Sequence, residues 1–500
     1  MLTEPLAPPP AGPPPASPVL ADAGLLRADA FIDGAWSPSL GGHRYPVADP
    51  ATGHVLCHVA RCGEAEADRA ILAAQAALPG WRATPETARS RLLRGLHYQI
   101  ITHAGDLALL VTLESGKPLA EAREEVLYAA GYVEWFAECA KRINGEVIPA
   151  PRGDMRLLAF REAVGVVGCI TPWNFPLAML ARKVAPALAA GCTVVCKPSE
   201  ETPLAGLALA ELVRRAGFPA GCVNLVSGDA PAIGRALTRS PLVRKLTFTG
   251  STATGKALLA ACAATMKRTS MELGGNAPFL VFADADLGAA VDGLLAAKFR
   301  NAGQTCIAPN RVLAEAPVQD AVAARLLDAV GRMRVGNGLD PGVGMGPLVH
   351  AGAVDRVLAL VGEAVSRGAR LLCGGARTGQ GDAFLAPTLL TGVTPDMAIA
   401  RQEIFGPVLA VGTFEDEDEA LRVANDTASG LAAYAYTRDA GRLWRLPRRL
   451  EVGMCGLNST SLSNPMAPFG GIKESGHGRE GSTHGLDDYL DWRVTCLGGL

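Results

Sequence analysis

The chain has 500 residues, and its 47 Lys and Arg nearly balance its 49 Asp and Glu. This length exceeds what one ordinary hydrophobic core supports and predicts two or three domains. The balanced charge gives no indication of a nucleic-acid or anionic-membrane partner, and no apolar run reaches the roughly 18 residues that a membrane-spanning helix requires.

The N-terminal segment begins with many Pro and Ala residues, and we expect residues 1–28 to form a disordered tail. Its first basic residue is Arg27, so a positively charged targeting signal is not indicated. The twelve cysteines and eight histidines of the chain are scattered, without a CxxC pair or metal-ligand spacing. We therefore expect free thiols, a cytoplasmic location and no metal site.

From residue 163 onwards, strand-like and helix-like segments alternate with short turns. The strand-like segments are AVGVVGCI, TVVCKPS, CVNLVSG and VRKLTFTG, and an amphipathic helical pattern follows each of them. This alternation predicts a parallel sheet with helices on both faces and ligands at the carboxyl ends of its strands. A second alternating region runs from about 277 to 470, which predicts two α/β domains joined near 271–275.

Two glycine-rich segments are candidate phosphate-binding loops. GHGREG at 476–481 has the Gly-x-Gly-x-x-Gly spacing, but it follows no strand and opens no clear helix, so we interpret it as a coincidental match. TGSTATG follows a predicted strand and opens a predicted helix. Gly250 permits close backbone approach there, and Ser251 either donates to a phosphate or simply caps the helix.

Three residues in separate segments are candidates for nucleophilic chemistry. Cys306 lies on the polar stretch FRNAGQTCIAPN, whereas most other cysteines have apolar neighbours, and a polar setting favours a reactive thiolate. Glu272, in SMELGGN, has apolar neighbours that would raise its pKa towards that of a general base; the alternative is a buried structural carboxylate. Asn174, in ITPWNFP, either donates to an oxyanion or caps a helix.

Seven segments, in order, together resemble the aldehyde dehydrogenase superfamily. They are ITPWNFP, CKPSE, FTGSTATG, MELGGN, FRNAGQTC, EIFGPV and PFGGIKESGHGREG, and the resemblance extends from about residue 30 to the C-terminus. Within the superfamily the chain most resembles the succinate-semialdehyde dehydrogenases, through ARKVAPALAAGC, KFRNAGQTC and GREGSTHGLDDYL.

The resemblance implies a Rossmann-type cofactor-binding domain, an α/β catalytic domain and a small oligomerisation arm. The expected bounds are 29–146 and 160–272 for the cofactor-binding domain, 273–474 for the catalytic domain, and 147–159 with 485–500 for the arm. A homodimer or homotetramer is also implied, because LDDYLDWRVTCLGGL has the pattern of a strand that can extend a partner's sheet.

The resemblance also assigns roles to individual residues. Cys306 would attack the aldehyde, Asn174 and the Cys306 N–H would hold the oxyanion, and Glu272 would activate the water that hydrolyses the thioester. With Glu272 present, hydrolysis is favoured over transfer to coenzyme A. The positions that match cofactor contacts are Trp173, Lys197, Ser199, Glu200, Gly250, Ser251, Leu273, Glu403 and Phe405.

Glu200 favours NAD as the coenzyme. A carboxylate at this position accepts the adenosine ribose hydroxyls and repels the 2′-phosphate of NADP. NADP remains possible, because Lys197 could tolerate a phosphate; read in isolation, Lys197 could equally be a surface lysine.

Arg182, Arg300 and Ser463 match the carboxylate-binding positions of succinate-semialdehyde dehydrogenases, and the planar fork of Arg suits a carboxylate. Alternatives that stay open are glutarate semialdehyde, which is one methylene longer, and a broad-range or betaine-type enzyme in which both arginines are irrelevant. A non-catalytic protein of the same fold would be expected to lack Cys306, Glu272 or Asn174.

Ala308 stands where several similar enzymes carry a second Cys, so a disulfide switch with Cys306 is not expected.

Overall fold

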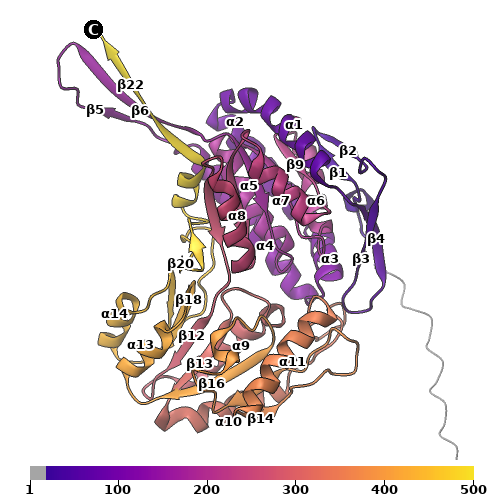
Figure 1. The fold of residues 1–500 in the computed structure, drawn as a ribbon, viewed down its shortest axis with the longest axis vertical. Coiled ribbons are helices and arrows are strands. Elements are labelled where there is room, and N and C mark those ends of the chain that lie inside the picture. Colours follow the sequence, from indigo (N-terminus) through magenta and orange to yellow (C-terminus); the bar gives the residue numbers. More distant parts are fainter. Residues whose placement is uncertain (1–18) are drawn as a thin grey trace, which may run out of the picture.

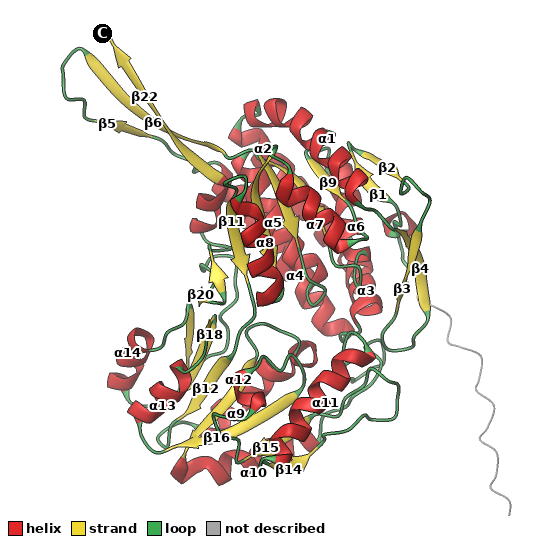
Figure 2. Ribbon diagram, viewed as in Figure 1, coloured by secondary structure: helices red, strands yellow, loops and turns green. Residues whose placement is uncertain are grey.

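The computed structural model describes residues 19–500 and shows two α/β units and a narrow projecting arm (Figure 1). Strands lie at the centre of each unit and helices lie around them (Figure 2). The predicted α/β class is therefore confirmed. Residues 1–18, the first part of the expected tail, lie outside the described residues.

The first unit is built on an eight-stranded sheet in which the five strands from β9 to β11 are parallel. The sheet order is β2 (Ala35–Ser37), β1 (Ala30–Ile32), β9 (Val223–Leu225), β8 (Thr193–Lys197), β7 (Val166–Ile170), β10 (Val243–Thr249), β11 (Arg268–Glu272) and β21 (Gly476–His477). The predicted alternation of strands and helices is confirmed here, and the C-terminal end of β11 points towards the second unit (Figure 2).

Helices cover both faces of this sheet. One face carries α5 (Pro176–Ala190) and α6 (Leu204–Arg215), backed by α2 (Glu86–Thr102), α3 (Ala104–Ser115) and α4 (Leu119–Ala140), and the other carries α1 (Glu64–Ala83), α7 (Ala230–Arg239) and α8 (Thr252–Ala263). Helix α5 has Pro in its first turn and ends at Gly191, whose φ of 90° is left-handed. Proline preorganises a helix start and glycine accepts the left-handed cap, so α5 begins directly after the ITPWNF turn.

The second unit contains a seven-stranded sheet that is parallel except for one edge strand. Its order is β14 (Arg370–Cys373), β15 (Thr388–Thr391), β16 (Val408–Phe414), β13 (Pro309–Glu315), β12 (Ala277–Val281), β18 (Ala432–Tyr436) and β19 (Met454–Leu457). Its helices are α9 (Leu287–Phe299), α10 (Gln319–Gly331), α11 (Ala351–Ser366), α12 (Ala398–Arg401), α13 (Glu417–Asn425) and α14 (Ala440–Arg449).

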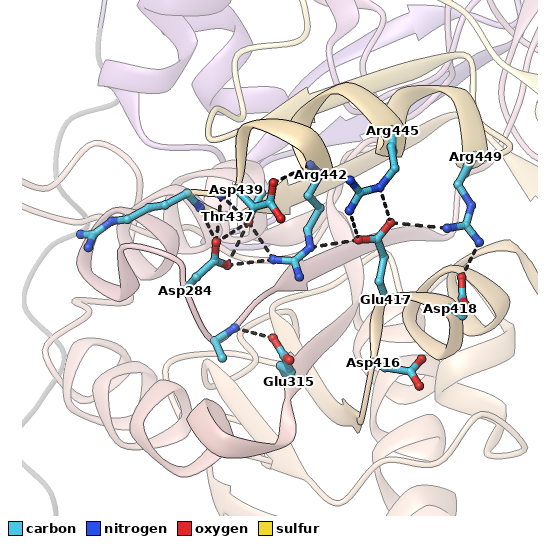
Figure 3. A network of polar contacts seen from close by, with 12 residues as sticks. Asp284, Glu315, Asp416, Glu417, Asp418, Thr437, Asp439, Arg442, Arg445 and Arg449 are labelled. Carbon is cyan, nitrogen blue, oxygen red and sulfur yellow. Dashed lines mark hydrogen bonds and ion pairs between the residues drawn. The ribbon is translucent and has the colours of Figure 1, made fainter.

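A polar network fixes α14 to the rest of the second unit (Figure 3). Arg442 contacts Asp284, which follows β12, at 3.0 Å and Glu417 on α13 at 3.2 Å. Its guanidinium also lies 4.0 Å above the ring of Phe282. These contacts are remote from the cleft between the units and serve packing.

The arm is a three-stranded antiparallel sheet in the order β22 (Leu490–Gly498), β6 (Met155–Ala163) and β5 (Glu146–Ile148). Two further antiparallel pairs complete the strands: the hairpin of β3 (Arg44–Ala48) with β4 (Val55–Ala60), and β17 (Ser429–Gly430) with β20 (Ile472–Lys473), which are distant in sequence. Four 3₁₀ turns are also present in the described part, at Ala23–Leu25 (η1), Arg300–Gly303 (η2), Ala316–Val318 (η3) and His484–Tyr489 (η4).

The expected tail is corrected at its C-terminal end, because residues 19–28 pack against the first unit. The backbone N–H groups of Ala21 and Asp22 donate to the carboxylate of Asp106 at 2.8 and 2.9 Å, and Leu25 is fully buried. Apolar burial and satisfied backbone donors order this segment, which its composition alone did not reveal. In the described part of the chain, no helix is long and apolar enough to cross a membrane.

Candidate active site

A cavity of about 460 Å³ lies between the two units, at the carboxyl ends of the parallel strands of the first. Sequence reasoning placed ligands at this edge. The cavity is lined by twelve of the predicted site residues: Trp173, Asn174, Arg182, Gly250, Ser251, Glu272, Leu273, Arg300, Cys306, Glu403, Phe405 and Ser463. Residues from positions 173 to 463 thus meet at one place.

The other three predicted cofactor contacts, Lys197, Ser199 and Glu200, lie at the end of β8, outside this cavity. Lys197 is buried, which rules out the surface alternative, and its ammonium group forms an ion pair with the exposed carboxylate of Glu200. Each charge of this pair therefore balances the other.

Cys306 follows a tightly wound turn at the end of α9. Asn301, Ala302 and Gly303 all have left-handed φ values, of 52°, 53° and 75°. Such conformations are costly for residues with a Cβ and persist only where their surroundings enforce them, often at active sites. A Cβ on Gly275 would stand 2.2 Å from the carbonyl oxygen of Cys306, so this glycine lets the loop after β11 lie against the backbone of Cys306.

The thiol of Cys306 is half-buried and free. Burial raises its pKa to about 12, and the negative charge of Glu403 acts in the same direction. Arg182 and Arg300 oppose this shift but do not cancel it. The resting cysteine is therefore a thiol at neutral pH.

Asn174 and Cys306 line the same cavity, and each has an N–H that is not used in a hydrogen bond among the described residues. The side-chain amide of Asn174 donates one hydrogen to the carbonyl of Gln304 at 3.0 Å and retains a second. The backbone N–H of Cys306 donates to no group in residues 19–500. The backbone carbonyl of Asn174 accepts from the Lys117 ammonium at 2.7 Å and from the side-chain amide of Asn301 at 2.9 Å, and these bonds fix the position of Asn174.

Glu272 ends β11 and points into the cavity. It is buried, and neither of its carboxyl oxygens has a hydrogen-bond partner among the described residues. Burial raises the pKa of Glu272 well above its usual value, and the nearby negative charge of Glu480 raises it further. This is the environment expected of a general base rather than of a structural ion pair.

Glu480, a residue that sequence reasoning did not single out, is paired with two buried cations. It contacts Arg182 at 2.7 Å and also Lys183. Burial alone would raise the pKa of Glu480, but Arg182 and Lys183 keep it below its ordinary value. GHGREG thus contains a buried counter-ion, Glu480, and opens no phosphate-binding helix.

The cleft suits a nicotinamide dinucleotide. Ser251 caps α8 by accepting from the N–H of Thr254, as the capping interpretation predicts, and Gly250 and Ser251, which precede this helix N-terminus, line the cavity. A Cβ on Gly274 would lie 2.7 Å from Glu403 Oε2 and 3.4 Å from Thr252 Oγ1, so glycine here lets the Glu403 carboxylate lie against the backbone at the cavity wall. Trp173 and Phe405, which line the same cavity, meet edge to face at 5.5 Å.

The three predicted carboxylate-binding residues differ in how free they are. Arg300 is exposed and forms no ion pair or hydrogen bond among residues 19–500; its guanidinium lies 5.1 Å from the ring of Phe175. Arg182 is buried rather than solvated, and Glu480 already balances its charge. The hydroxyl of Ser463 is hydrogen-bonded to the hydroxyl of Tyr128.

Sequence reasoning missed four site residues: Lys117, Glu125, Tyr128 and Glu480. Lys117 and Glu125 form a fully buried ion pair at 2.5 Å, and Glu125 accepts from two N–H groups in the first turn of α5. Three of the four precede the TPWNF turn on or near α4, in a region where the sequence offered only an amphipathic pattern. Lys117, Glu125 and Glu480 are recognisable in the structure as buried charges, which are costly unless they are paired.

A family model described as "Aldehyde dehydrogenase family" matches residues 36–495. Two relatives, the 3-sulfolactaldehyde dehydrogenase of Pseudomonas putida and the glutarate-semialdehyde dehydrogenase of Pseudomonas aeruginosa, are each 49% identical over 96% of this chain, and the match covers 99% and 100% of their own lengths. The NADP(+) succinate-semialdehyde dehydrogenase GabD of Escherichia coli is 49% identical over 96% of this chain and 99% of its own. The crystal structure of succinate-semialdehyde dehydrogenase from Burkholderia pseudomallei has 50% identity and a TM-score of 0.95, covering 96% of this chain and 99% of that one.

Proposed function

The chain belongs to the aldehyde dehydrogenase family, and we propose that it oxidises succinate semialdehyde, or an ω-semialdehyde acid of similar length, to the dicarboxylate. The observation that carries this proposal is the placement of Cys306, Glu272 and Asn174 in one cavity with Arg300, a cation that has no ion-pair partner among residues 19–500. Glutarate semialdehyde is the alternative, since a relative carries that name and one methylene discriminates weakly.

The residues of the site support a covalent mechanism. The Cys306 thiol gives its proton to the carboxylate of Glu272, which passes it to solvent, as the sulfur attacks the aldehyde carbon. The oxyanion of the resulting thiohemiacetal accepts from the unused N–H of Asn174 and from the Cys306 N–H. A nicotinamide dinucleotide in the cavity would supply the acceptor for the hydride of this carbon, and loss of the hydride would leave a thioester on Cys306. Glu272 then takes a proton from water, the hydroxide attacks the thioester, and the proton returns to the departing sulfur, which releases the acid and the thiol.

A steady-state screen tests the substrate. Succinate semialdehyde, glutarate semialdehyde and butanal would be compared, and we expect kcat/KM for succinate semialdehyde to exceed that for butanal by about 100-fold, because an anion meets a free guanidinium. Arg300→Leu should remove most of that difference and leave butanal unchanged, while Cys306→Ala should abolish all turnover. Equal values for succinate semialdehyde and butanal in the wild type would contradict the proposal.

NAD is the coenzyme that we propose as preferred. The family uses NAD or NADP, and one relative is named for NADP(+), so kinship does not decide between them. The carboxylate of Glu200 would face a 2′-phosphate, and its pairing with Lys197 removes the cation that would attract one. Glu200→Ser should raise kcat/KM with NADP about tenfold or more by freeing Lys197; a wild type that prefers NADP would refute this assignment.

We also propose that the protein forms a homodimer or homotetramer through its arm. In the arm, β22 pairs with β6 on one side only within the described residues, and Trp492 and Val494 are exposed upon it. An exposed edge strand with apolar side chains is a surface that pairing covers.

All twelve cysteines are unpaired, and the cytoplasmic location expected on that basis stays a prediction.

A further inference from the structure

Tyr128 lines the cavity beside the carboxylate-binding residues, and no role in the proposed mechanism depends on it. It lies on α4, and its hydroxyl contacts two of the three predicted carboxylate-binding residues. Arg182 donates to it through Nη1 at 3.4 Å, and the Ser463 hydroxyl is hydrogen-bonded to it. Tyr128 is therefore the group that connects Arg182 to Ser463.

Arg182 is poorly placed to bind a substrate carboxylate as a free cation. Glu480 balances its charge at 2.7 Å, and the guanidinium lies between the rings of Phe469, at 4.0 Å, and Tyr132, at 5.3 Å. Since an aromatic face attracts a cation, these contacts hold Arg182 where it is. Arg182 also donates to the hydroxyl of Tyr128, which extends its influence towards Ser463.

The direction of the hydrogen bonds around Tyr128 follows from which groups can only donate. A guanidinium cannot accept, so the oxygen of Tyr128 is the acceptor from Arg182. The Tyr132 hydroxyl, 3.3 Å from that of Tyr128, donates to the carbonyl of Asn464 at 3.4 Å. Tyr128 can then donate its own proton to the oxygen of Ser463. When Ser463 accepts in this way, its hydroxyl proton has no acceptor among the described residues.

We infer that Tyr128 is a specificity-determining residue that presents the Ser463 hydroxyl as a donor to the anionic end of the substrate; this rests on the proposed function. Arg182, Tyr128 and Ser463 then donate in one direction, and each bond in such a chain polarises the next. A bound carboxylate accepts only, so it selects this arrangement. The anion-binding site thus consists of the free cation Arg300 and a hydroxyl relay that begins at Arg182.

The ring and the hydroxyl of Tyr128 can be tested separately. The ring packs edge to face against Tyr132 at 5.0 Å, and Tyr128→Phe retains that packing. Tyr128→Phe and Ser463→Ala should each raise KM for succinate semialdehyde about tenfold, because each removes a hydrogen bond in a chain that ends on a charged acceptor. KM for butanal, which has the same chain length without the carboxylate, should stay within about twofold, and kcat should change little in both variants.

The double variant distinguishes a relay from two independent contacts. Because Tyr128 acts through Ser463, the double variant should resemble Ser463→Ala alone, whereas independent contacts would give about a 100-fold rise in KM. Tyr132→Phe is the matched control: it removes a neighbouring hydroxyl that faces a backbone carbonyl, and it should leave the ratio of the two KM values unchanged. Melting temperatures of all variants report whether packing is preserved.

Three results would overturn the inference. If the wild type prefers succinate semialdehyde but Tyr128→Phe leaves the ratio of the KM values for succinate semialdehyde and butanal unchanged, the inference alone is contradicted. A double variant whose KM for succinate semialdehyde rises about 100-fold also contradicts the inference alone. A wild type that does not distinguish succinate semialdehyde from butanal contradicts the proposed function and the inference with it.

Discussion

The thiol of Cys306 lies between charges of both signs, and this balance controls its reactivity. Burial and Glu403 favour the neutral thiol, whereas Arg182 and Arg300 favour the thiolate. A cysteine that stays protonated at rest is protected from oxidation, because the thiolate is the reactive form. The same balance makes the thiol sensitive to single charge changes nearby.

Glu403→Gln should make Cys306 more reactive towards iodoacetamide at pH 8. The carboxylate of Glu403 raises the pKa of Cys306, so its removal lowers that pKa and increases the thiolate fraction; a shift of half a unit gives about threefold faster alkylation. The rate would be measured by mass spectrometry of the peptide that contains Cys306. Glu415→Gln, an exposed change in the second unit, is the control, and an unchanged or slower rate in Glu403→Gln would contradict the argument.

At the residue scale, motifs predicted the reacting groups better than their partners. Cys306, Glu272 and Asn174 were accessible from sequence because each lies in a short segment with a distinctive pattern. Ser463 meets Tyr128 across 335 positions, and Glu480 meets Lys183 across 297. No local pattern encodes such pairings, so the partners that tune the site appear only in the folded chain.

The start of α5 shows how elements position the site. Glu125, on α4, accepts from the N–H groups of Leu177 and Ala178, and Lys117 joins Glu125 to the carbonyl of Asn174. A buried carboxylate at a helix N-terminus satisfies donors that the helix itself leaves open. One ion pair therefore fixes both the helix and the turn that carries Asn174.

Lys117→Met should destabilise the protein and slow the reaction. It leaves Glu125 as an unpaired buried charge, which costs about 3–5 kcal/mol, and it removes a hydrogen bond that holds Asn174. We expect a lower melting temperature and a lower kcat. The double variant Lys117→Met/Glu125→Gln removes the unpaired charge and should recover most of the melting temperature but not kcat; a single variant with wild-type stability would contradict this role.

At the element scale, the strands β7 to β10 and the helices between them were predictable because their hydrophobic runs alternate with amphipathic segments. The edges of the same sheet were not. Strands β1, β2 and β21 have only two or three residues each, too few for a periodic pattern, and β21 comes from a segment more than 200 residues beyond β11. Their pairing depends on tertiary contacts.

At the scale of the whole molecule, the cavity lies between two units whose sheets have separate cores. Between β11 and β12 the chain passes from one sheet to the other through the segment that follows Glu272. The Gly274–Gly275 pair lets this segment pass close to both Glu403 and Cys306. The connection between the units is thus itself a wall of the site.

The arm projects from the first unit and presents apolar side chains to solvent, which makes it the surface expected to join subunits (Figure 1). Trp492 and Val494 are 55% and 64% exposed on β22, and burying such surface stabilises an interface by about 25 cal/mol per Å². Trp492→Lys/Val494→Lys should therefore shift the protein to a smaller species in light scattering coupled to size-exclusion chromatography. Leu72→Lys, a comparable change at an exposed position of α1, is the control and should leave the mass of the assembly unchanged. An arm variant whose assembly keeps the wild-type mass would show that assembly does not depend on the arm.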